Sequence, residues 1–332
     1  MTVETVFSAD VLKLDPAETT EHIASVLRAM IKEQLRRKGA VVGLSGGIDS
    51  SVTAALCARA LGKERVLGLL MPEADSSDDS LRLGRLLAES LGIRTIVEDI
   101  TPILQAAGCY ERRDSAIRTV CPEYGPGYGC KIALPDLLND DRYPVFYAVL
   151  RPPGGGAEKK VRLTAEAYLG IVAATNFKQR TRKMMEYYHA DRLHYAVAGT
   201  PNRLEYDQGF FVKLGDGAAD VKPIAHLYKS QVYQLAEYLG IPQEIQTRPS
   251  TTDTYSLQQS QEEFYFSLPL RKMDLCLYAK NEGIPVADVA LAAELSVDQV
   301  ERVFRMIDSK RKATRYLHTA PRLIDAIPEV HC

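Results

Sequence analysis

Residues 41–51 read VVGLSGGIDSS, an apolar run followed by a glycine-rich turn and the start of a polar-to-apolar helical pattern. The glycines at positions 43, 46 and 47 let the backbone turn sharply and present amide N–H groups to a ligand. The N-terminus of the helix that follows adds positive potential. The stretch therefore predicts an anion-binding loop between a β-strand and an α-helix.

Two common kinds of phosphate loop are excluded by the sequence. The lysine-bearing loop of nucleotide hydrolases needs G-x-x-x-x-G-K-[ST], which occurs nowhere in the chain, and no G-x-G-x-x-G opens a helix. A tight strand-to-helix turn with Asp49 as its helix cap is the alternative without function. The complete string after an apolar run favours a phosphate site of another class.

The residues around this loop indicate an alternation of strands and helices. Apolar, β-branched runs predict strands at 40–44, 65–71, 94–97 and 195–198. Helical periodicity predicts helices at 16–37, 49–61, 77–91, 164–190 and 228–239, and again at 270–280, 286–293 and 297–310. We therefore expect an α/β fold, a doubly wound parallel sheet with helices on both faces and a helical C-terminal part.

The alternation breaks between about residues 101 and 164, a segment rich in Pro, Gly and Tyr that includes PEYGPGYG and RPPGGG. Structureless segments of this length are uncommon inside compact domains. Two hypotheses stay open: an insertion with small elements of its own, or a mobile flap. Residues 1–332 are otherwise interpreted as a single domain.

The composition excludes several classes of partner. The chain has 332 residues and a formal net charge of −2, so no basic field favours nucleic acid. No window approaches the roughly 18 uninterrupted apolar residues of a membrane span, and the N-terminus does not resemble a signal peptide. We expect a cytoplasmic protein whose six irregularly spaced cysteines are reduced thiols.

The string S-G-G-x-D-S resembles the PP-loop of the N-type ATP pyrophosphatases, in which the loop cradles the pyrophosphate leaving group. Four further stretches resemble motifs of one member of that group, the NAD synthetase family, and occur in its order. They are MPEADSSDDS at 71–80, GTPNRLE at 199–205, KLGDGAAD at 213–220 and LYKSQV at 227–232. The chain is identified as a divergent member with an insertion, and an adenine nucleotide alpha-hydrolase-like fold is implied.

The resemblance implies a role for each matching position. For ATP it implies Ser45, Gly46, Gly47, Asp49, Ser50, Met71, Thr200, Lys229 and Ser250, with Asp49 and Lys229 as the catalytic pair. Asp49 and Glu205 would share Mg²⁺, a hard ion suited to carboxylate and phosphate oxygens. For the acid substrate it implies Arg180 or Arg182, Lys213, Asp220, Lys310 and Arg311. Taken singly, each of these charged residues is also explained as a solvated side chain or a helix cap.

The implied reaction is an ATP-dependent ligation. ATP and Mg²⁺ activate a carboxylate as its acyl-adenylate, and ammonia displaces AMP to give an amide. The chain shows no Cys-His-Glu signature of a glutaminase, so free ammonia or ammonia from a separate glutaminase is expected. A homodimer is also implied by the resemblance.

Three hypotheses for the function stay open. The first is an NAD synthetase that amidates nicotinic acid adenine dinucleotide. The second is a related enzyme that amidates another carboxylic acid in a specialised pathway, because Gln261 stands where the family has an acid. The third is a non-catalytic ATP-binding subunit, against which the presence of Asp49 and Glu205 argues.

Overall fold

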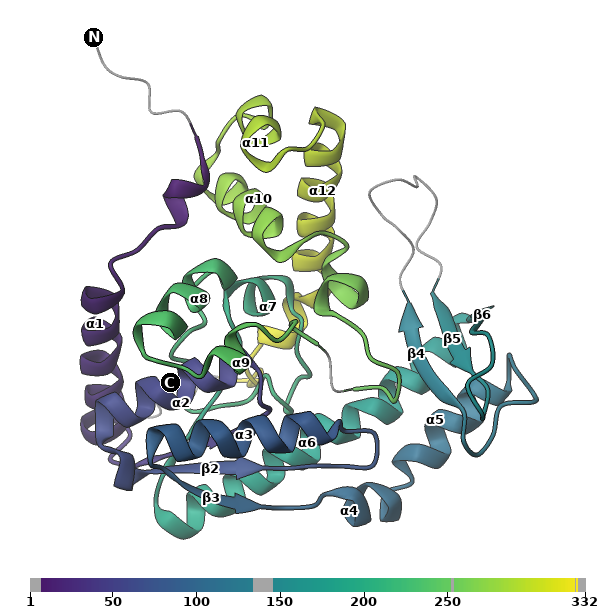
Figure 1. Cartoon of the computed structure of the whole chain (residues 1–332), viewed down its shortest axis with the longest axis horizontal. Helices are drawn as coiled ribbons and strands as arrows, with labels where there is room; N and C mark the ends of the chain where they lie inside the picture. Colours follow the sequence, from purple (N-terminus) through teal and green to yellow (C-terminus); the bar gives the residue numbers. More distant parts are fainter. Residues whose placement is uncertain (1–6, 134–145, 252–253, 326, 328–332) are drawn as a thin grey trace.

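The computed structural model describes residues 7–133, 146–251, 254–325 and 327 (Figure 1). Its main sheet is parallel throughout and has the strand order β3-β2-β1-β7. The register places Val41 of the central strand opposite Leu67 on one side and Val197 on the other. The strands are β1 (Ala40–Gly43), β2 (Val66–Leu70), β3 (Arg94–Val97) and β7 (Ala196–Ala198), which confirms all four predicted strands.

Helices cover both faces of this sheet. Ala40 and Val42 of β1 pack into an apolar cluster with α1 (Pro16–Ala29), α2 (Ile48–Leu61), α3 (Asp78–Leu91) and α8 (Lys229–Tyr238). Val41 points the other way, into a cluster with α4 (Thr101–Ala106) and the long helix α6 (Ala165–Leu193). Strands buried on both faces are apolar at successive positions, which is why the predicted runs do not alternate. The doubly wound α/β fold is confirmed.

The first helix is shorter than predicted. Asp15 caps α1 by accepting hydrogen bonds from the backbone N–H groups of Ala17 and Glu18 at 2.9 and 3.0 Å. The helix ends at Ala29 and continues as one π-helical turn, η2 (Met30–Gln34). Arg36 then adopts a φ of 53°, a left-handed conformation that turns the chain toward β1. The predicted span of 16–37 included this turn because the apolar spacing does not reveal it.

The C-terminal helices form a second apolar cluster, which lies beside α8 on the side away from the main sheet (Figure 1). They are α10 (Leu270–Glu282), α11 (Val286–Ala293) and α12 (Val297–Thr314), close to the predicted spans. The shorter elements are η1 (Ala9–Leu12), η3 (Lys63–Arg65), α7 (Arg203–Gln208), α9 (Gln243–Gln246), η4 (Glu262–Phe266) and η5 (Arg315–His318). Among the described residues, no helix combines the length and apolar character needed to cross a membrane.

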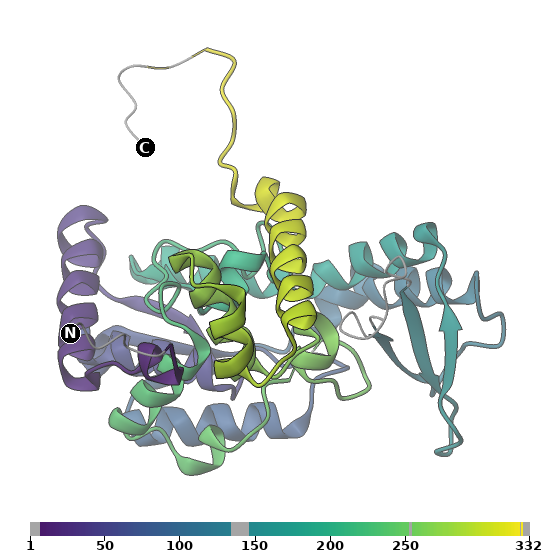
Figure 2. The same cartoon turned by 90° about the horizontal axis from the view of Figure 1, so that it is seen from above.

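The segment at 101–164 has elements of its own. It contains α4, then α5 (Cys109–Arg118), and an antiparallel sheet of β4 (Gly129–Ala133), β5 (Tyr147–Arg151) and β6 (Lys159–Arg162). This sheet lies at one end of the molecule, beside α5 and α6 (Figures 1 and 2). Its buried side packs on Ile171 of α6. Residues 134–145 of the segment lie outside the described residues, and much of the rest folds into these small elements.

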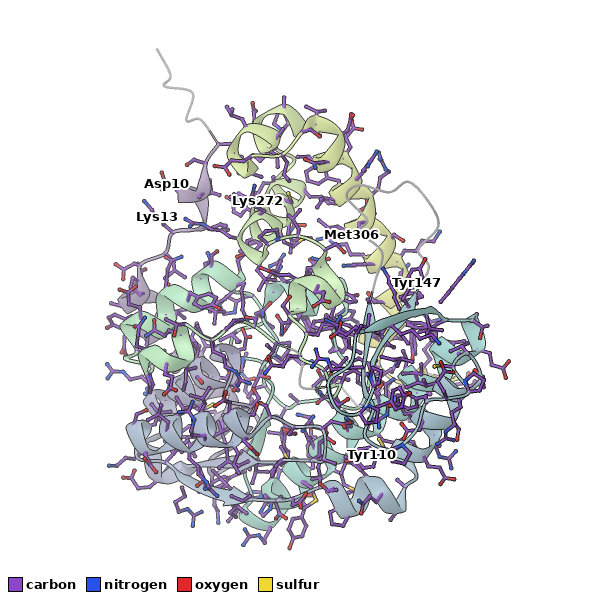
Figure 3. The ribbon with its side chains drawn as sticks, turned by 45° about the vertical axis from the view of Figure 1, so that its right-hand side comes forward. Asp10, Lys13, Tyr110, Tyr147, Lys272 and Met306 are labelled. Atoms are coloured by element: carbon purple, nitrogen blue, oxygen red, sulfur yellow. The ribbon has the colours of Figure 1, made fainter. Side chains whose placement is uncertain are left out.

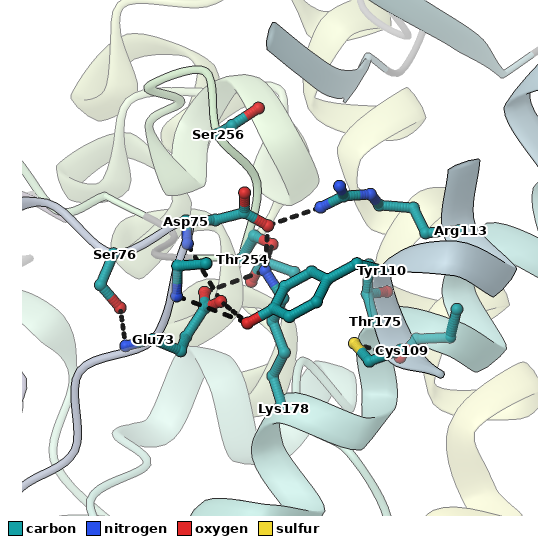
Figure 4. A network of polar contacts seen from close by, with 12 residues as sticks. Glu73, Asp75, Ser76, Cys109, Tyr110, Arg113, Thr175, Lys178, Thr254 and Ser256 are labelled. Atoms are coloured by element: carbon teal, nitrogen blue, oxygen red, sulfur yellow. Dashed lines mark hydrogen bonds and ion pairs between the residues drawn. The ribbon is translucent and has the colours of Figure 1, made fainter. Parts of the chain in front are cut away.

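A buried network of charges joins this segment to the main sheet (Figure 4). The Lys178 ammonium on α6 donates to Glu73 at 2.9 Å, to Asp75 at 2.6 Å and to the Thr254 carbonyl at 2.8 Å. Arg113 of α5 makes a second ion pair with Asp75 at 2.5 Å. Because the Lys178 side chain is only 1% exposed, its charge depends on these acids. The network fixes the loop that follows β2 against α5, α6 and the chain after α9.

We predict that Lys178→Met lowers the free energy of unfolding by about 3–5 kcal/mol, because it leaves the buried Glu73 carboxylate without its cation and leaves Asp75 with Arg113 alone. Urea denaturation followed by circular dichroism measures the change. Lys159→Met is the matched control, since Lys159 pairs with Glu123 in an exposed ion pair and its loss is expected to change little. Equal stabilities of the two variants would contradict a structural role for the network.

Candidate active site

The loop at 41–51 joins β1 to α2 and is held by its own serines. The Ser45 and Ser50 hydroxyl oxygens lie 3.2 Å apart, and the backbone N–H of Ser45 donates to Ser50 Oγ at 3.3 Å. Ser50 in turn donates to the carbonyl of Gly47 at 3.0 Å. Helix α2 begins directly after Gly47, so its free N–H groups face the same space. The predicted loop between strand and helix is present, and its anion binding stays a prediction.

Gly46 is the position where this loop requires glycine. Its φ is +72°, and an added Cβ would lie 2.8 Å from the Ser80 carbonyl oxygen and 2.9 Å from Leu83 Cβ. A side chain would therefore be strained in conformation and would collide with α3. Gly46 shapes the loop from behind, whereas Ser45, Gly47, Asp49 and Ser50 face the cavity described below.

Asp49 lies in the first turn of α2 and forms an ion pair with Lys229, the first residue of α8. Lys229 is only 2% exposed. Burial alone lowers the pKa of its ammonium, but the nearby carboxylates of Asp49 and Glu205 raise this pKa above its ordinary value. Asn202 donates to the other oxygen of Asp49 at 3.1 Å. The predicted catalytic pair is thus in direct contact and fixed by a third side chain.

Glu205 lies beside this pair, in the first turn of α7. Its carboxylate accepts a hydrogen bond from the backbone N–H of Asn202 at 3.2 Å and one from the Gln261 side chain at 2.8 Å. Burial, followed by the negative charge of Asp49, raises the pKa of Glu205 to about 8. Two carboxylates held this near one another, one of them reluctant to ionise, are suited to share a cation.

A cavity of about 1040 Å³ opens at the carboxyl ends of β1 and β7. In the order β3-β2-β1-β7, the strands β2 and β3 lie on one side of β1, and β7 lies on the other side. Ligands of open α/β sheets bind at such a switch in strand order. Among the residues predicted to bind ATP or metal, Ser45, Gly47, Asp49, Ser50, Met71, Thr200, Glu205 and Ser250 line this cavity.

Four of the residues predicted to bind the acid substrate also line it. Arg180 and Arg182 project from α6 and donate to the backbone carbonyls of Lys213 and Met71 at 3.3 and 3.4 Å. The Lys213 ammonium is held by the carbonyls of Tyr316 and Thr319 at 2.8 and 2.9 Å. Lys310 of α12, the helix on which Met306 is labelled in Figure 3, donates to the carbonyl of Tyr265 at 2.5 Å.

The remaining two predicted residues are not brought to the cavity. Asp220 accepts hydrogen bonds from the backbone N–H of Val197 at 2.7 Å and from the Tyr187 hydroxyl at 3.2 Å. Arg311 forms a bidentate ion pair with Asp207, in which Nε and one terminal nitrogen donate to the two carboxylate oxygens at 2.6 and 2.7 Å. Both side chains have these partners within the chain, and neither lines the cavity.

The sequence interpretation gave no role to Asn202, Gln261 or Arg248. Asn202 lies inside the GTPNRLE stretch at 199–205, in which only Thr200 and Glu205 were assigned roles. Gln261 and Arg248 come from the chain after α9 and reach the site only through folding. Arg248 lines the cavity and donates to the carbonyl of Gly46 at 3.4 Å.

The segment at 101–164 also contributes to the cavity wall. Ile132 of β4 and Phe146 before β5 line it, and Phe146 stacks on Tyr168 of α6 with ring centroids 3.8 Å apart and planes inclined at 16°. The cavity therefore has a polar end at the phosphate loop and an aromatic wall at the inserted sheet.

Comparison with known proteins agrees with this geometry. Residues 19–119 and 159–315 match the family model described as NAD synthase. The NH(3)-dependent NAD(+) synthetase of Rhizobium meliloti (strain 1021) is 60% identical over 325 residues, which cover 98% of this chain and 97% of that protein. Residues 120–158, unmatched by the family model, include β4 and β5.

Two solved structures resemble the fold. The NMN synthetase from Francisella tularensis has a TM-score of 0.65 at 21% identity and covers 95% of this chain and 100% of its own. The NH3-dependent NAD synthetase from Campylobacter jejuni has a TM-score of 0.61 at 23% identity and covers 94% and 100%. At these identities the likeness bears on the fold alone. The family match over most of the sequence, and the close relative, show that the chain belongs to the NAD synthase family.

Proposed function

We propose that the chain is an ammonia-dependent NAD synthetase, which uses ATP to amidate nicotinic acid adenine dinucleotide. The observation that carries the proposal is the buried Asp49–Lys229 pair beside a lysine-free phosphate loop. Asp49 and Glu205 line one cavity, and Lys229 lies buried behind Asp49 and does not line it. The relative that is 60% identical over nearly its whole length, named for this activity, supports the choice of acid.

The reaction has two displacements. In the first, a carboxylate oxygen of the acid attacks the α-phosphorus of ATP, and the bond from that phosphorus to the bridging oxygen of pyrophosphate breaks. In the second, the nitrogen of ammonia attacks the acyl carbon, AMP leaves, and a proton is released. The hydroxyls of Ser45 and Ser50 and the N–H groups that begin α2 are placed to bind phosphate oxygens. Catalysis then follows from positioning and charge stabilisation.

The donor set of the chain fits Mg²⁺, which the family resemblance implies. Mg²⁺ in proteins usually binds one or two carboxylates together with substrate phosphates. Asp49 and Glu205 supply two carboxylates that share Asn202 as a hydrogen-bond partner. Burial, followed by the negative charge of Asp49, raises the pKa of Glu205, and a cation beside the two carboxylates would favour their ionised forms. We assign these two residues as the ligands; when bound, the ion would offset charge on the phosphates.

The nitrogen donor and the assembly state belong to the same proposal. Free ammonia is the proposed donor, in agreement with the name of the R. meliloti relative, and a separate glutaminase is its alternative source. The family resemblance implies a homodimer, and light scattering would measure the mass of the assembly in solution.

The test incubates the pure protein with MgATP, an ammonium salt and nicotinic acid adenine dinucleotide, and measures NAD, AMP and pyrophosphate. We expect the three products in equal amounts. An inert dinucleotide with activity on another acid from a panel supports the alternative amide synthetase. If no acid gives AMP, the result supports the third hypothesis, a non-catalytic ATP-binding subunit.

We predict that Asp49→Asn lowers AMP formation by on the order of 10²-fold or more, because the variant loses both a metal ligand and the partner of Lys229. Steady-state assays measure the loss. Asp79→Asn is the control, since Asp79 pairs with Arg82 on the exposed side of α3. Undiminished turnover of Asp49→Asn at any Mg²⁺ concentration would refute the assignment.

We predict a pH dependence of acid binding from Lys310. Burial lowers the pKa of its ammonium to about 7, and no carboxylate of the described residues forms an ion pair with it. The free protein therefore loses this positive charge as the pH rises through about 7, and KM for the anionic acid should rise over the same range. Lys310→Arg should flatten the profile, because the guanidinium stays charged. A wild-type KM independent of pH from 6 to 9 would contradict this role.

A further inference from the structure

Arg248 follows α9 and reaches across to the phosphate loop. Its guanidinium donates to the Gly46 carbonyl at 3.4 Å, to Ser80 Oγ at 3.0 Å and to Ser77 Oγ at 3.3 Å. These contacts join three parts of the chain that are far apart in sequence: the phosphate loop, the start of α3 and the segment that ends at Ser250. The positive group therefore lies at the loop that carries no lysine of its own.

Two helix N-termini flank this guanidinium. Helix α2 begins at Ile48 and helix α3 begins at Asp78, and each has 14 residues. The free N–H groups of a helix start carry partial positive charge. Arg248 contacts the residue two positions before the start of α2 and the residue directly before the start of α3. The side chain thus adds a full positive charge to a place that already favours anions.

The position of Arg248 relative to the cavity points to a ligand. Arg248, Ser77 and Ser80 line the same cavity as Ser45. Two residues further along the chain, the Ser250 hydroxyl oxygen is buried and has no hydrogen-bond partner among the described residues, although Ser250 lines the cavity. A buried hydroxyl without a partner is costly unless a ligand or water completes it. Phosphate oxygens would accept from both side chains.

We propose that Arg248 binds the pyrophosphate part of ATP and stabilises it as the leaving group, with the Ser250 hydroxyl as a second donor. The inference rests on the proposed adenylation and adds a residue to it. The planar guanidinium suits phosphate oxygens, to which it donates two parallel hydrogen bonds. Negative charge grows on the pyrophosphate as its bond to the α-phosphorus breaks.

The test measures binding of magnesium pyrophosphate, MgATP and AMP to the full chain by calorimetry, for wild type, Arg248→Ala and Arg248→Lys. We expect Arg248→Ala to weaken pyrophosphate and ATP binding roughly ten- to a hundredfold, the size of a lost hydrogen bond to a charged group. AMP lacks the pyrophosphate, so its affinity should not change. The affinity of Arg248→Lys for pyrophosphate and ATP should be intermediate, because lysine keeps the positive charge but cannot donate two parallel hydrogen bonds from one planar group.

Arg82→Ala is the matched control. Arg82 lies on α3, pairs with Asp79 and Glu244 at 3.1 and 2.6 Å, and does not line this cavity. It should leave all three affinities unchanged. Equal weakening of AMP and pyrophosphate in Arg248→Ala, or no weakening of pyrophosphate, would overturn the inference.

These measurements separate the inference from the proposed function. Pyrophosphate binding needs no acid substrate, so the comparison of variants holds even if the protein makes no NAD. Conversely, a wild type that makes NAD while Arg248→Ala binds pyrophosphate normally would refute only the role of Arg248.

Discussion

The buried ion pair between Lys229 and Asp49 is the constraint on which the rest of the site depends. Taking both charges out of water costs several kcal/mol per ion, and their attraction repays this only when the geometry is fixed. The geometry is fixed here from outside the pair. Asp274 of α10 is fully buried and accepts hydrogen bonds from the backbone N–H groups of Lys229 and Ser230 at 3.1 and 2.7 Å. The C-terminal helices thereby hold the start of α8, and with it the lysine, against the phosphate loop.

The same arrangement explains why the site suits anions. Helices α2, α7 and α8 place Asp49, Glu205 and Lys229 in their first turns, so their N-termini meet at the carboxyl ends of β1 and β7. Each N-terminus adds partial positive charge, which favours phosphate groups. The two carboxylates would oppose this field without a cation. Lys229 forms an ion pair with Asp49, and burial, followed by the negative charge of Asp49, raises the pKa of Glu205.

The motifs beside strands supplied residues that line the cavity, whereas two other residues predicted from motifs, Asp220 and Arg311, do not line it. The loop after β1 and the Thr200–Glu205 stretch after β7 were predictable, because short motifs beside strands of a parallel sheet share one edge. Arg248 and Gln261 were not, since only the folded path after α9 brings them there. Asp220 and Arg311 matched motifs, yet Val197 and Asp207 occupy their hydrogen-bonding groups. A motif identifies a residue's position in the sequence, but it does not show which group in the fold forms a hydrogen bond or ion pair with its side chain.

The inserted sheet bears on the choice of acid through the same cavity. At the polar end, charges and helix termini lie where we propose that the reacting phosphates bind, and small displacements there would be costly. At the other end, Ile132, Phe146 and Tyr168 offer apolar surface that can bind a remote part of the acid without touching the reacting atoms. Binding energy gained far from the reaction can be used to hold the carboxylate in place for attack. The family model does not match residues 120–158, which include β4 and Phe146 of this wall. Discrimination between acids is therefore expected to depend on this wall, and ATP chemistry on the loop at 41–51.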